Sequence, residues 1–370
     1  METPKVALVH DWLTGQRGGE KVLEVFAEIF PKAPIFTLFH FQGSQVADVE
    51  ARRIITSFIQ RLPLLKKRYR FYLPFFPLAV ELFDFQEYDM IISSSHCAAK
   101  GAIPRPDALH ICYVHSPMRY AWNQYFSYFP PNKLGFISRR VIPPVIHRLR
   151  IWDESSSHRV DHFIANSLSV AERIKKYYRR EADVIHPPVD TELFYPGEKT
   201  GEYFLIVSAL VPYKRIGLAV EAFNQTGLPL KIVGQGPDFK ALKSMAKSNI
   251  QFLGALSPED LRLCYQDARA LIMPGEEDFG INSLESQACG VPVVAYGRGG
   301  ATETVIPEET GLLFSEPDVP GLLAALDKFR DFTFNKKTIR AHALKFSRST
   351  FKIKTSSFFN AKWAEHMSDR

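Results

Sequence analysis

Short apolar runs alternate with amphipathic stretches along the whole chain. Residues 5–10 (KVALVH) predict a buried strand, and the apolar positions from about 19 to 30 recur with the spacing of a helix. Further strands are predicted at 35–39, 90–94, 109–115 and 162–166. This alternation is typical of α/β proteins, in which helices cover parallel sheets.

A proline-rich passage, Ile185 to Asp190, separates this pattern from a second one like it. After it, strands are predicted at 203–210, 230–233, 250–253, 270–273, 291–295 and 312–314, with helices between them and helical sequence after about 317. We therefore predict two Rossmann-like, doubly wound domains, residues 1–188 and 189–347. Ligands are expected at the carboxyl ends of the strands and in a cleft between the domains.

Composition agrees with a folded chain of two domains. The chain has 370 residues, 46% of them hydrophobic and 23% charged, which excludes general disorder. The apolar runs are all shorter than the ~20 residues that span a bilayer, and the first residues do not resemble a secretory signal. Four cysteines without a C-x-x-C pair argue against a disulfide framework and favour a reducing compartment, here the cytoplasm.

Positive charge is concentrated in one part of the chain. Residues 51–150 contain 15 Lys and Arg against 5 Asp and Glu, whereas the other 270 residues contain 31 against 35. Cations alternate with large apolar residues at 52–70, a pattern that suits a helix lying on an anionic membrane, and 136–152 could extend it. The alternative is ordinary helices with solvated faces. No nucleic-acid-binding motif accompanies the charge, so we predict no nucleic-acid partner.

Two segments of the first domain carry candidate binding groups. Gly18 and Gly19 follow the first strand and begin a helix, where free amides favour an anion, although a tight turn would also need glycine. His115 ends another strand, and Arg119 follows it. A histidine in that position is placed to bind a ligand, but a structural role is equally open.

Two further segments lie in the second domain. Lys214 and Arg215 precede a helix, where cations oppose the helix dipole, so they indicate either a bound polyanion or a solvated surface pair. Glu277 lies in an acidic loop and Glu285 in the helix that follows. Such carboxylates can accept hydrogen bonds from sugar hydroxyls. An acidic helix start would explain Glu277 but not Glu285.

Taken in order, these segments resemble glycosyltransferase family 4, whose members are retaining transferases of the GT-B fold that use nucleotide sugars. The specific match is the E-x7-E motif from Glu277 to Glu285, and the resemblance covers about residues 5–320. It implies two Rossmann-like domains that face a central cleft, with a helix at 348–370 that returns to the first domain. Residues 113–122 resemble the mannosyl- and glucosyltransferases of bacterial surface-polysaccharide assembly.

The resemblance also implies roles for individual residues. The catalytic groups would be His115 near the anomeric carbon, Glu277 on the donor sugar and Lys214 on the leaving diphosphate. Glu285 would hold the ribose hydroxyls. The binding set would include Gly18, Gly19, Gly254, Phe279, Gly280, Ile281 and Glu285. To these we add Arg119, from its place after His115, and Arg215 as a hypothesis of our own.

One position departs from the family pattern. The family usually has an arginine five residues before the lysine, and Ala209 stands there in this chain. The missing guanidinium would remove a bidentate phosphate contact, which Arg215 or a cation of the first domain would have to supply.

We therefore predict a metal-independent retaining glycosyltransferase with no cofactor. It would transfer glucose or mannose from a UDP- or GDP-sugar to a glycan or lipid-linked acceptor, in the cytoplasm or at the inner face of the plasma membrane. The sequence contains no Asp-x-Asp motif that would bridge the diphosphate through a metal. A noncatalytic sugar-nucleotide-binding module is the alternative.

Overall fold

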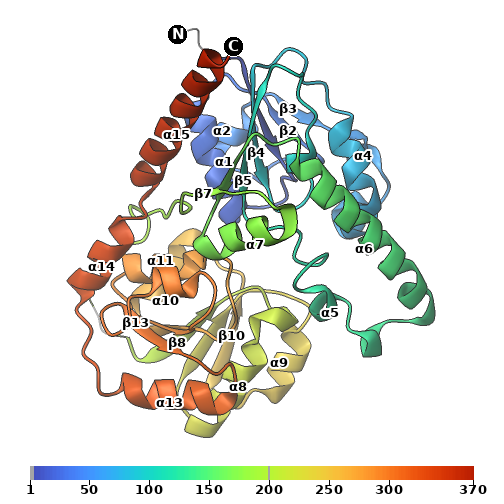
Figure 1. The fold of residues 1–370 in the computed structure, drawn as a ribbon. Coiled ribbons are helices and arrows are strands. Elements are labelled where there is room, and N and C mark those ends of the chain that lie inside the picture. The colour runs from blue at the N-terminus through green and yellow to red at the C-terminus, as the bar shows by residue number, and fades with distance from the viewer. Residues whose placement is uncertain (1–3, 199–200) are drawn as a thin grey trace. The chain divides into compact units, whose positions relative to one another are not determined.

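The computed structural model describes residues 4–198 and 201–370, which form two compact units (Figure 1). Unit 1 comprises Met1–Pro187 and Phe351–Arg370, and unit 2 comprises Pro188–Thr350. The expected division after residue 188 lies one residue from the division between Pro187 and Pro188. Both units are α/β folds built on a parallel sheet.

Unit 1 contains a seven-stranded parallel sheet in the order β3-β2-β1-β4-β5-β6-β7. Its strands are β1 (Val6–His10), β2 (Ile35–Thr37), β3 (Ile54–Thr56), β4 (Met90–Ser95), β5 (Leu109–Val114), β6 (His162–Ala165) and β7 (Asp183–Val184). Its helices are α1 (Gly18–Ile29), α2 (Ala47–Glu50), α3 (Leu65–Arg68), α4 (Phe76–Glu81), α5 (Tyr125–Tyr128), α6 (Phe136–Ser157), α7 (Leu168–Tyr178) and α15 (Arg348–Ser368). Five short 3₁₀ helices complete the described helical segments, four of them in unit 1.

The C-terminal helix α15 completes the core of unit 1. Its residues Phe351, Phe359 and Trp363 are buried in the same apolar cluster as α1 and β1. The Phe26 ring of α1 lies 5.9 Å from that of Phe351 and 5.3 Å from that of Phe359, centroid to centroid. Aromatic pairs at such distances add to the free energy of burial. Helix α15 therefore belongs to the same core as β1 and α1.

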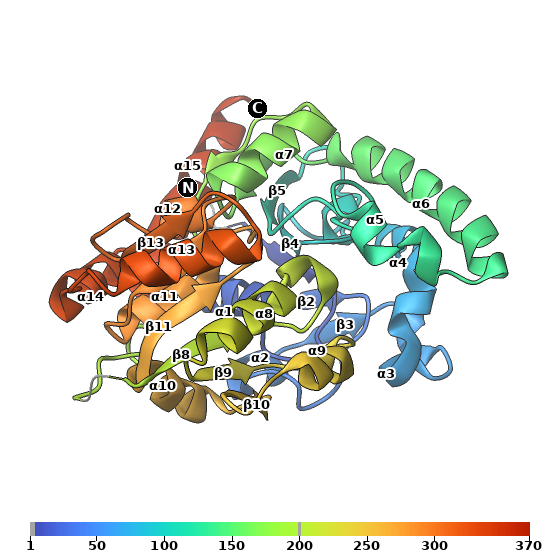
Figure 2. The same cartoon turned by 90° about the horizontal axis from the view of Figure 1, so that it is seen from below.

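Unit 2 contains a six-stranded parallel sheet in the order β10-β9-β8-β11-β12-β13. Its strands are β8 (Tyr203–Val207), β9 (Leu230–Val233), β10 (Ile250–Gly254), β11 (Ala268–Met273), β12 (Val293–Tyr296) and β13 (Gly311–Phe314). Its helices are α8 (Ile216–Thr226), α9 (Phe239–Met245), α10 (Pro258–Gln266), α11 (Ile281–Ala288), α12 (Ala301–Thr304), α13 (Val319–Phe329) and α14 (Lys336–Leu344). Helices cover both faces of the sheet (Figure 2).

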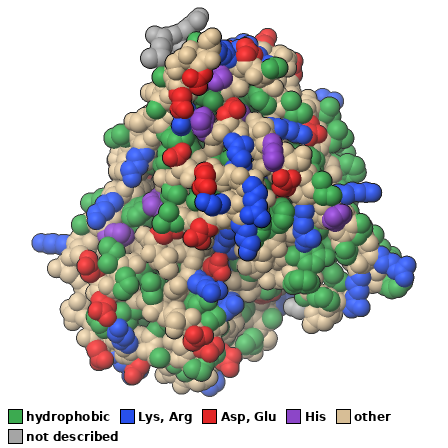
Figure 3. Space-filling model, in the orientation of Figure 1, with side chains coloured by type: hydrophobic (Ala, Val, Ile, Leu, Met, Phe, Trp, Pro, Cys, Tyr) green, Lys and Arg blue, Asp and Glu red, His purple; other side chains and the backbone are tan. Residues whose placement is uncertain are grey.

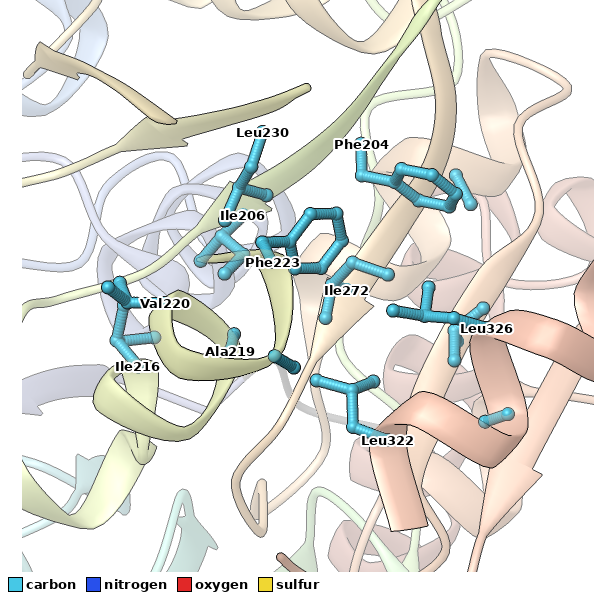
Figure 4. Close-up of a cluster of buried hydrophobic side chains, with 14 of the residues drawn as sticks. Phe204, Ile206, Ile216, Ala219, Val220, Phe223, Leu230, Ile272, Leu322 and Leu326 are labelled. Carbon is cyan, nitrogen blue, oxygen red and sulfur yellow. The ribbon is translucent and has the colours of Figure 1, made fainter. Parts of the chain in front are cut away.

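The larger core of unit 2 lies between its sheet and the helices α8 and α13. Phe204 and Ile206 of β8 point toward Phe223 of α8, and Leu322 and Leu326 of α13 close the cluster (Figure 4). These side chains are 3% exposed or less, so they fix the strands rigidly. The loops that follow β8 and β11 are thereby held in place.

The prediction of a surface helix at 52–70 is wrong. Residues 54–56 form the edge strand β3, residues 58–61 a 3₁₀ helix, and Leu65–Arg68 the single turn α3. The Ser57 hydroxyl accepts a hydrogen bond from the Ile59 amide at 3.2 Å and begins the 3₁₀ turn. Pro63 then prevents a continuous helix because proline lacks an amide proton. The cations are therefore displayed on short turns.

Candidate functional site

In unit 2, Lys214 and Glu277 come together at the point where the strand order reverses. β8 lies between β9 and β11, so the loops after β8 and β11 leave the sheet side by side and run in opposite directions. Lys214 is in the first loop and Glu277 in the second, and the Lys214 ammonium is paired with the Glu277 carboxylate. Both side chains are less than one-fifth exposed. Open α/β sheets bind ligands at this position.

Glycines allow the loops around this ion pair to pack backbone against backbone. A methyl group added to Gly275 would lie 2.8 Å from the Lys214 carbonyl oxygen. One added to Gly300 would lie 2.2 Å from the Phe279 Cα, and the Gly300 amide donates to the Glu277 carbonyl at 2.9 Å. Larger residues would push these loops apart. The lysine and the glutamate are therefore held by their main chains.

The helix α11 begins directly beside Glu277. Gly280 has a φ of 86°, which favours glycine, and Ile281 is the first helical residue. Phe279 is 3% exposed and packs against Phe346 of the same unit. The amides of residues 279–281 lie at the positive end of the helix dipole, which attracts anions.

Glu285 lies one turn into α11 and is only 3% exposed. Its carboxylate accepts a hydrogen bond from the Tyr265 hydroxyl at 3.2 Å. Glu277 and Glu285 are thus not equivalent groups at a common surface. Glu277 is ion-paired at the strand ends, whereas Glu285 is anchored in the interior.

The other predicted residues of unit 2 are more dispersed. The guanidinium of Arg215 donates to the Pro317 carbonyl at 3.0 Å and lies over the Tyr296 ring. It is thus directed toward Pro317 and Tyr296. Gly254 ends β10 with a φ of 75°, and its carbonyl accepts the Gly234 amide at 2.7 Å. Gly254 therefore marks the turn after an outer strand of the sheet.

In unit 1, three histidines gather at the corresponding reversal of strand order. β1 lies between β2 and β4, and β5 is the next strand beyond β4. His10 ends β1, His96 follows β4 and His115 follows β5, with ring centroids 6.3–6.5 Å apart. A methyl group added to Gly19 would lie 3.4 Å from the ring of His10 and 3.4 Å from that of His115. The start of α1 therefore packs against the histidine cluster.

Ser94 links two of these rings. Its hydroxyl is 3.1 Å from His10 Nδ1 and 2.8 Å from His115 Nε2. A hydroxyl has one proton, so Ser94 donates to one ring and accepts an N–H from the other. Burial lowers the pKa of His10 to about 4, and burial with the neighbouring His96 and His10 lowers that of His115 well below its usual value. Both rings are therefore neutral at pH 7.

The remaining predicted residues of unit 1 lie beside this cluster. Gly18 begins α1 with open space where a side chain would project. Arg119 is half-buried in the turn after His115, and its carbonyl accepts the Gln124 amide at 2.8 Å. The Asn166 amide donates to the His115 carbonyl at 3.0 Å, which fixes the main chain of His115.

His96 is the residue that sequence reasoning undervalues. Its neighbours in sequence are serines and a cysteine, and this context favours a purely structural role for His96. The structure places its ring against Asp11, with Nδ1 3.0 Å from Oδ2. Asp11 is 85 residues away in the chain, so only the pairing of β1 with β4 brings the two together.

Comparison with known proteins identifies the family. A model described as "Glycosyltransferase Family 4" matches residues 18–193, and one described as "Glycosyl transferases group 1" matches residues 190–336. Together the two matches span residues 18–336 and so include most of each unit. The chain belongs to glycosyltransferase family 4.

Curated relatives in this family resemble the chain over part of their length. A D-inositol 3-phosphate glycosyltransferase of Acidothermus cellulolyticus is 30% identical over 224 residues, which is 50% of each chain. A GDP-mannose-dependent monoacylated alpha-(1-6)-phosphatidylinositol monomannoside mannosyltransferase of Corynebacterium glutamicum is 36% identical over 140 residues, 34% of this chain and 36% of the relative. The chain thus spans about half the length of the first of these relatives and about a third of the second.

A solved structure resembles the chain over almost all of both molecules. HepE of Anabaena in complex with UDP aligns with a TM-score of 0.71 at 16% identity, covering 96% of this chain and 100% of HepE. At this identity the likeness concerns the fold. The family 4 chain therefore has the GT-B fold predicted from its sequence.

Two features are absent from the residues that the structure describes. Between residues 4 and 370, leaving out 199–200, no group of three or more His, Cys, Asp and Glu side chains could hold a metal ion. Within the same ranges no helix is both long and apolar enough to cross a membrane.

Proposed function

We propose that this family 4 chain transfers glucose or mannose from a UDP- or GDP-sugar to a glycan or lipid-linked acceptor of bacterial polysaccharide or glycolipid synthesis, with retention at the anomeric carbon. The observation that carries the proposal is the Lys214–Glu277 pair beside the start of α11. The relatives named above act on inositol phosphate or phosphatidylinositol mannoside, and HepE binds UDP. These names support a nucleotide-sugar donor and a lipid-linked acceptor.

The groups of unit 2 suit a sugar diphosphate. The Lys214 ammonium and the Glu277 carboxylate form an ion pair and neutralise each other. A donor would separate them, with Lys214 on the diphosphate and Glu277 on the sugar hydroxyls. Negative charge grows on the diphosphate as the glycosidic bond breaks, so a fixed cation and helix amides stabilise the transition state more than the ground state. Glu285, held by Tyr265, is left for the ribose hydroxyls.

The groups of unit 1 suit the sugar as it becomes positively charged. Neutral His115 can accept a hydrogen bond or offer a dipole to an oxocarbenium-like ring without repelling it. We assign Gly18 and Gly19 to close approach of the diphosphate and Arg119 to the substrate. Arg215 donates to the Pro317 carbonyl and lies over the Tyr296 ring, so it would have to give up these contacts to replace the arginine missing at Ala209.

A screen of sugar nucleotides tests the function. At 100 times the Kd, UDP-glucose or GDP-mannose should stabilise the chain by about 2.7 kcal/mol, seen as a Tm increase of at least about 5 °C with a dye that reports both units. The donor that binds should be hydrolysed slowly to the nucleoside diphosphate, at the same rate in EDTA because the proposed site needs no metal. Binding without turnover would favour the noncatalytic sugar-nucleotide-binding module, and absence of binding would reject both.

A basic, apolar surface on unit 1 supports a membrane-linked acceptor. The basic apolar surface, as we call it, comprises residues 61–82 and 126–151. Phe71, Phe136 and Ile137 are 73–77% exposed within it. The first segment contains five Lys and Arg against one Glu, and the second contains five and no acid. Figure 3 shows hydrophobic and basic side chains mixed in the region of α6.

The two segments of this surface pack on the same hydrophobic cluster of unit 1. Leu65 and Phe76 of the first and Ile146 and Leu149 of the second are buried in the same apolar cluster. A hollow of about 340 Å³ opens on the first segment, lined by Phe41, Gln60, Leu64, Leu65, Lys66 and Lys67. Apolar walls with ammonium groups at the rim suit lipids with anionic headgroups. We propose that this surface holds the chain at the inner face of the membrane.

Vesicle sedimentation tests this surface. The chain should pellet with vesicles containing phosphatidylglycerol, and not with phosphatidylcholine alone. Lys66→Glu with Lys67→Glu should weaken binding at least about 30-fold, because each nearby cation contributes about 1 kcal/mol. Lys240→Glu with Lys243→Glu, two exposed lysines of unit 2, changes the net charge equally and should leave binding unchanged. Equal weakening by both pairs would show that only net charge matters and would reject the surface.

A further inference from the structure

The Asp11 carboxylate is held by an unusually complete set of donors. It is fully buried and accepts four main-chain N–H groups of the turn after β4: those of His96 and Cys97 on Oδ2, at 2.6 and 2.9 Å, and those of Ala98 and Ala99 on Oδ1, at 2.6 and 2.7 Å. His96 Nδ1 approaches the same Oδ2 at 3.0 Å. A carboxylate so bound stays ionised and immobile.

This arrangement orients the His96 ring. Nδ1 faces Asp11, so Nδ1 carries the proton and Nε2, on the opposite side of the ring, carries the lone pair. The His96 side chain is 35% exposed, and the Trp12 ring packs edge-on against it with centroids 4.5 Å apart. The ring centroid of His115 is 6.3 Å away. His96 thus presents a basic nitrogen next to the residue that we assign to the anomeric centre.

The three clustered histidines differ in their affinity for a proton. Burial lowers the pKa values of His10 and His115, whereas at His96 the charge and hydrogen bond of Asp11 outweigh burial and raise the pKa above its usual value. The titratable and charged groups that face His96 from the surrounding elements are Asp11, Glu20, Arg17, His10 and His115. Of the cluster, His96 is the ring suited to gain and lose a proton near neutral pH.

Hydrogen bonding to the turn after β4 explains why Asp11 is present, but it does not explain the histidine at position 96. The four main-chain donors would be satisfied by Asp11 whatever side chain stood at residue 96. These hydrogen bonds do not require a partly exposed imidazole with one nitrogen on the carboxylate. A carboxylate behind a histidine whose second nitrogen faces outward is the arrangement that general bases use.

We propose that His96 is the proton acceptor for the acceptor hydroxyl, with Asp11 as its positioning residue; this rests on the proposed function. The acceptor O–H bond breaks, its proton moves to His96 Nε2, and the oxygen forms the new bond to the anomeric carbon. The bond from that carbon to the diphosphate breaks, and its electron pair leaves with the nucleoside diphosphate. His96 then releases the proton to solvent. Retention of configuration at the anomeric carbon determines the face from which the acceptor oxygen attacks. It does not determine which group takes the proton of the acceptor hydroxyl.

Donor hydrolysis tests the proposal, since water can take the place of the acceptor hydroxyl. The probes are UDP-glucose and GDP-mannose, whichever raises the Tm, and the readout is single-turnover release of nucleoside diphosphate. His96→Ala should keep the Tm shift and lose about 10²-fold in rate, the lower end of what a general base contributes. Added imidazole should raise the rate of His96→Ala at least about tenfold, because free imidazole can take the place of the missing base. It would not repair a structural defect. His96→Gln should be as slow as His96→Ala, and added imidazole should not raise its rate, because the glutamine side chain fills the space that the histidine ring leaves.

The pH profile gives a second readout. The wild-type rate should fall as pH drops through a pKa above 6.5, since protonated His96 cannot accept a proton, and His96→Ala should lose this decline. His40→Ala is the matched control. His40 Nε2 lies 2.9 Å from the Glu50 carboxylate, which also accepts the amides of Gly43 and Gln45. It should leave rate, profile and imidazole response unchanged.

The outcomes separate this proposal from the one it rests on. A wild-type rate and profile in His96→Ala, with donor binding intact, overturns the role of His96 and leaves the donor site standing. A slow His96→Ala that imidazole does not rescue assigns His96 a structural role and equally rejects the proposal. Failure of the wild-type chain to bind either donor rejects the proposed function and the role of His96 with it.

Discussion

Lys214→Ala should lower the rate of sugar transfer or donor hydrolysis by about 10²–10³-fold. Removing one preorganised donor from the site of developing negative charge costs about 3–4 kcal/mol of transition-state stabilisation in enzymes. Lys214 is the cation paired with Glu277 at the strand reversal of unit 2, and its backbone is fixed against Gly275. Single-turnover release of nucleoside diphosphate measures the effect.

A matched variant separates this effect from general loss of a lysine. Lys328 of α13 forms an exposed ion pair with Glu308 at 2.8 Å in the same unit, and Lys328→Ala should retain the full rate. Glu277→Ala should be as slow as Lys214→Ala because it would lose the contact that we propose with the sugar hydroxyls. Both slow variants should keep a Tm within a few degrees of the wild type. A wild-type rate in Lys214→Ala would refute the donor site.

The positions of Glu277 and Glu285 relative to α11 could be predicted because the information is local in sequence. Glu277, Gly280 and Glu285 lie within nine residues, and the spacing alone places one carboxylate before the helix and one within it. The spacing could not reveal that Glu285 is anchored by Tyr265, which comes from another helix. Nor could it reveal that Gly299 and Gly300 brace the acidic loop, because that contact joins separate turns.

Most strands of the two sheets, though not β3 and β7, could be predicted from the sequence with ends within about two residues, whereas the strand order could not. Buried parallel strands are continuous apolar runs, so β1 and β12 can be recognised in the sequence. The edge strand β3 could not be recognised, because it has only three residues and lies in a segment rich in Lys and Arg. Strand order depends on contacts between distant segments, so the neighbourhood of Asp11 and His96 could not be read from the chain.

Asp153→Ala should lower the free energy of unfolding of unit 1 by about 3–5 kcal/mol, the cost of breaking a buried ion pair from one side. The Asp153 side chain of α6 is fully buried and holds three partners. It is 3.0 Å from the Lys100 ammonium, and it accepts the Trp122 indole N–H at 2.7 Å and the Tyr178 hydroxyl at 2.9 Å. Lys100 is itself only 2% exposed, so alanine would leave a buried positive charge without its counter-ion.

Urea unfolding followed by tryptophan fluorescence measures this cost selectively, because the four tryptophans, Trp12, Trp122, Trp152 and Trp363, all lie in unit 1. Glu87→Ala is the control: its pair with Lys5 is exposed to solvent, so its loss should leave the free energy of unfolding almost unchanged. Combining Lys100→Met with Asp153→Leu should recover much of the loss, since removing both charges also removes the cost of burying them. A loss below about 1 kcal/mol in Asp153→Ala would mean that water or a backbone shift replaces the carboxylate. The buried charge would then not be what ties α6 to the sheet of unit 1.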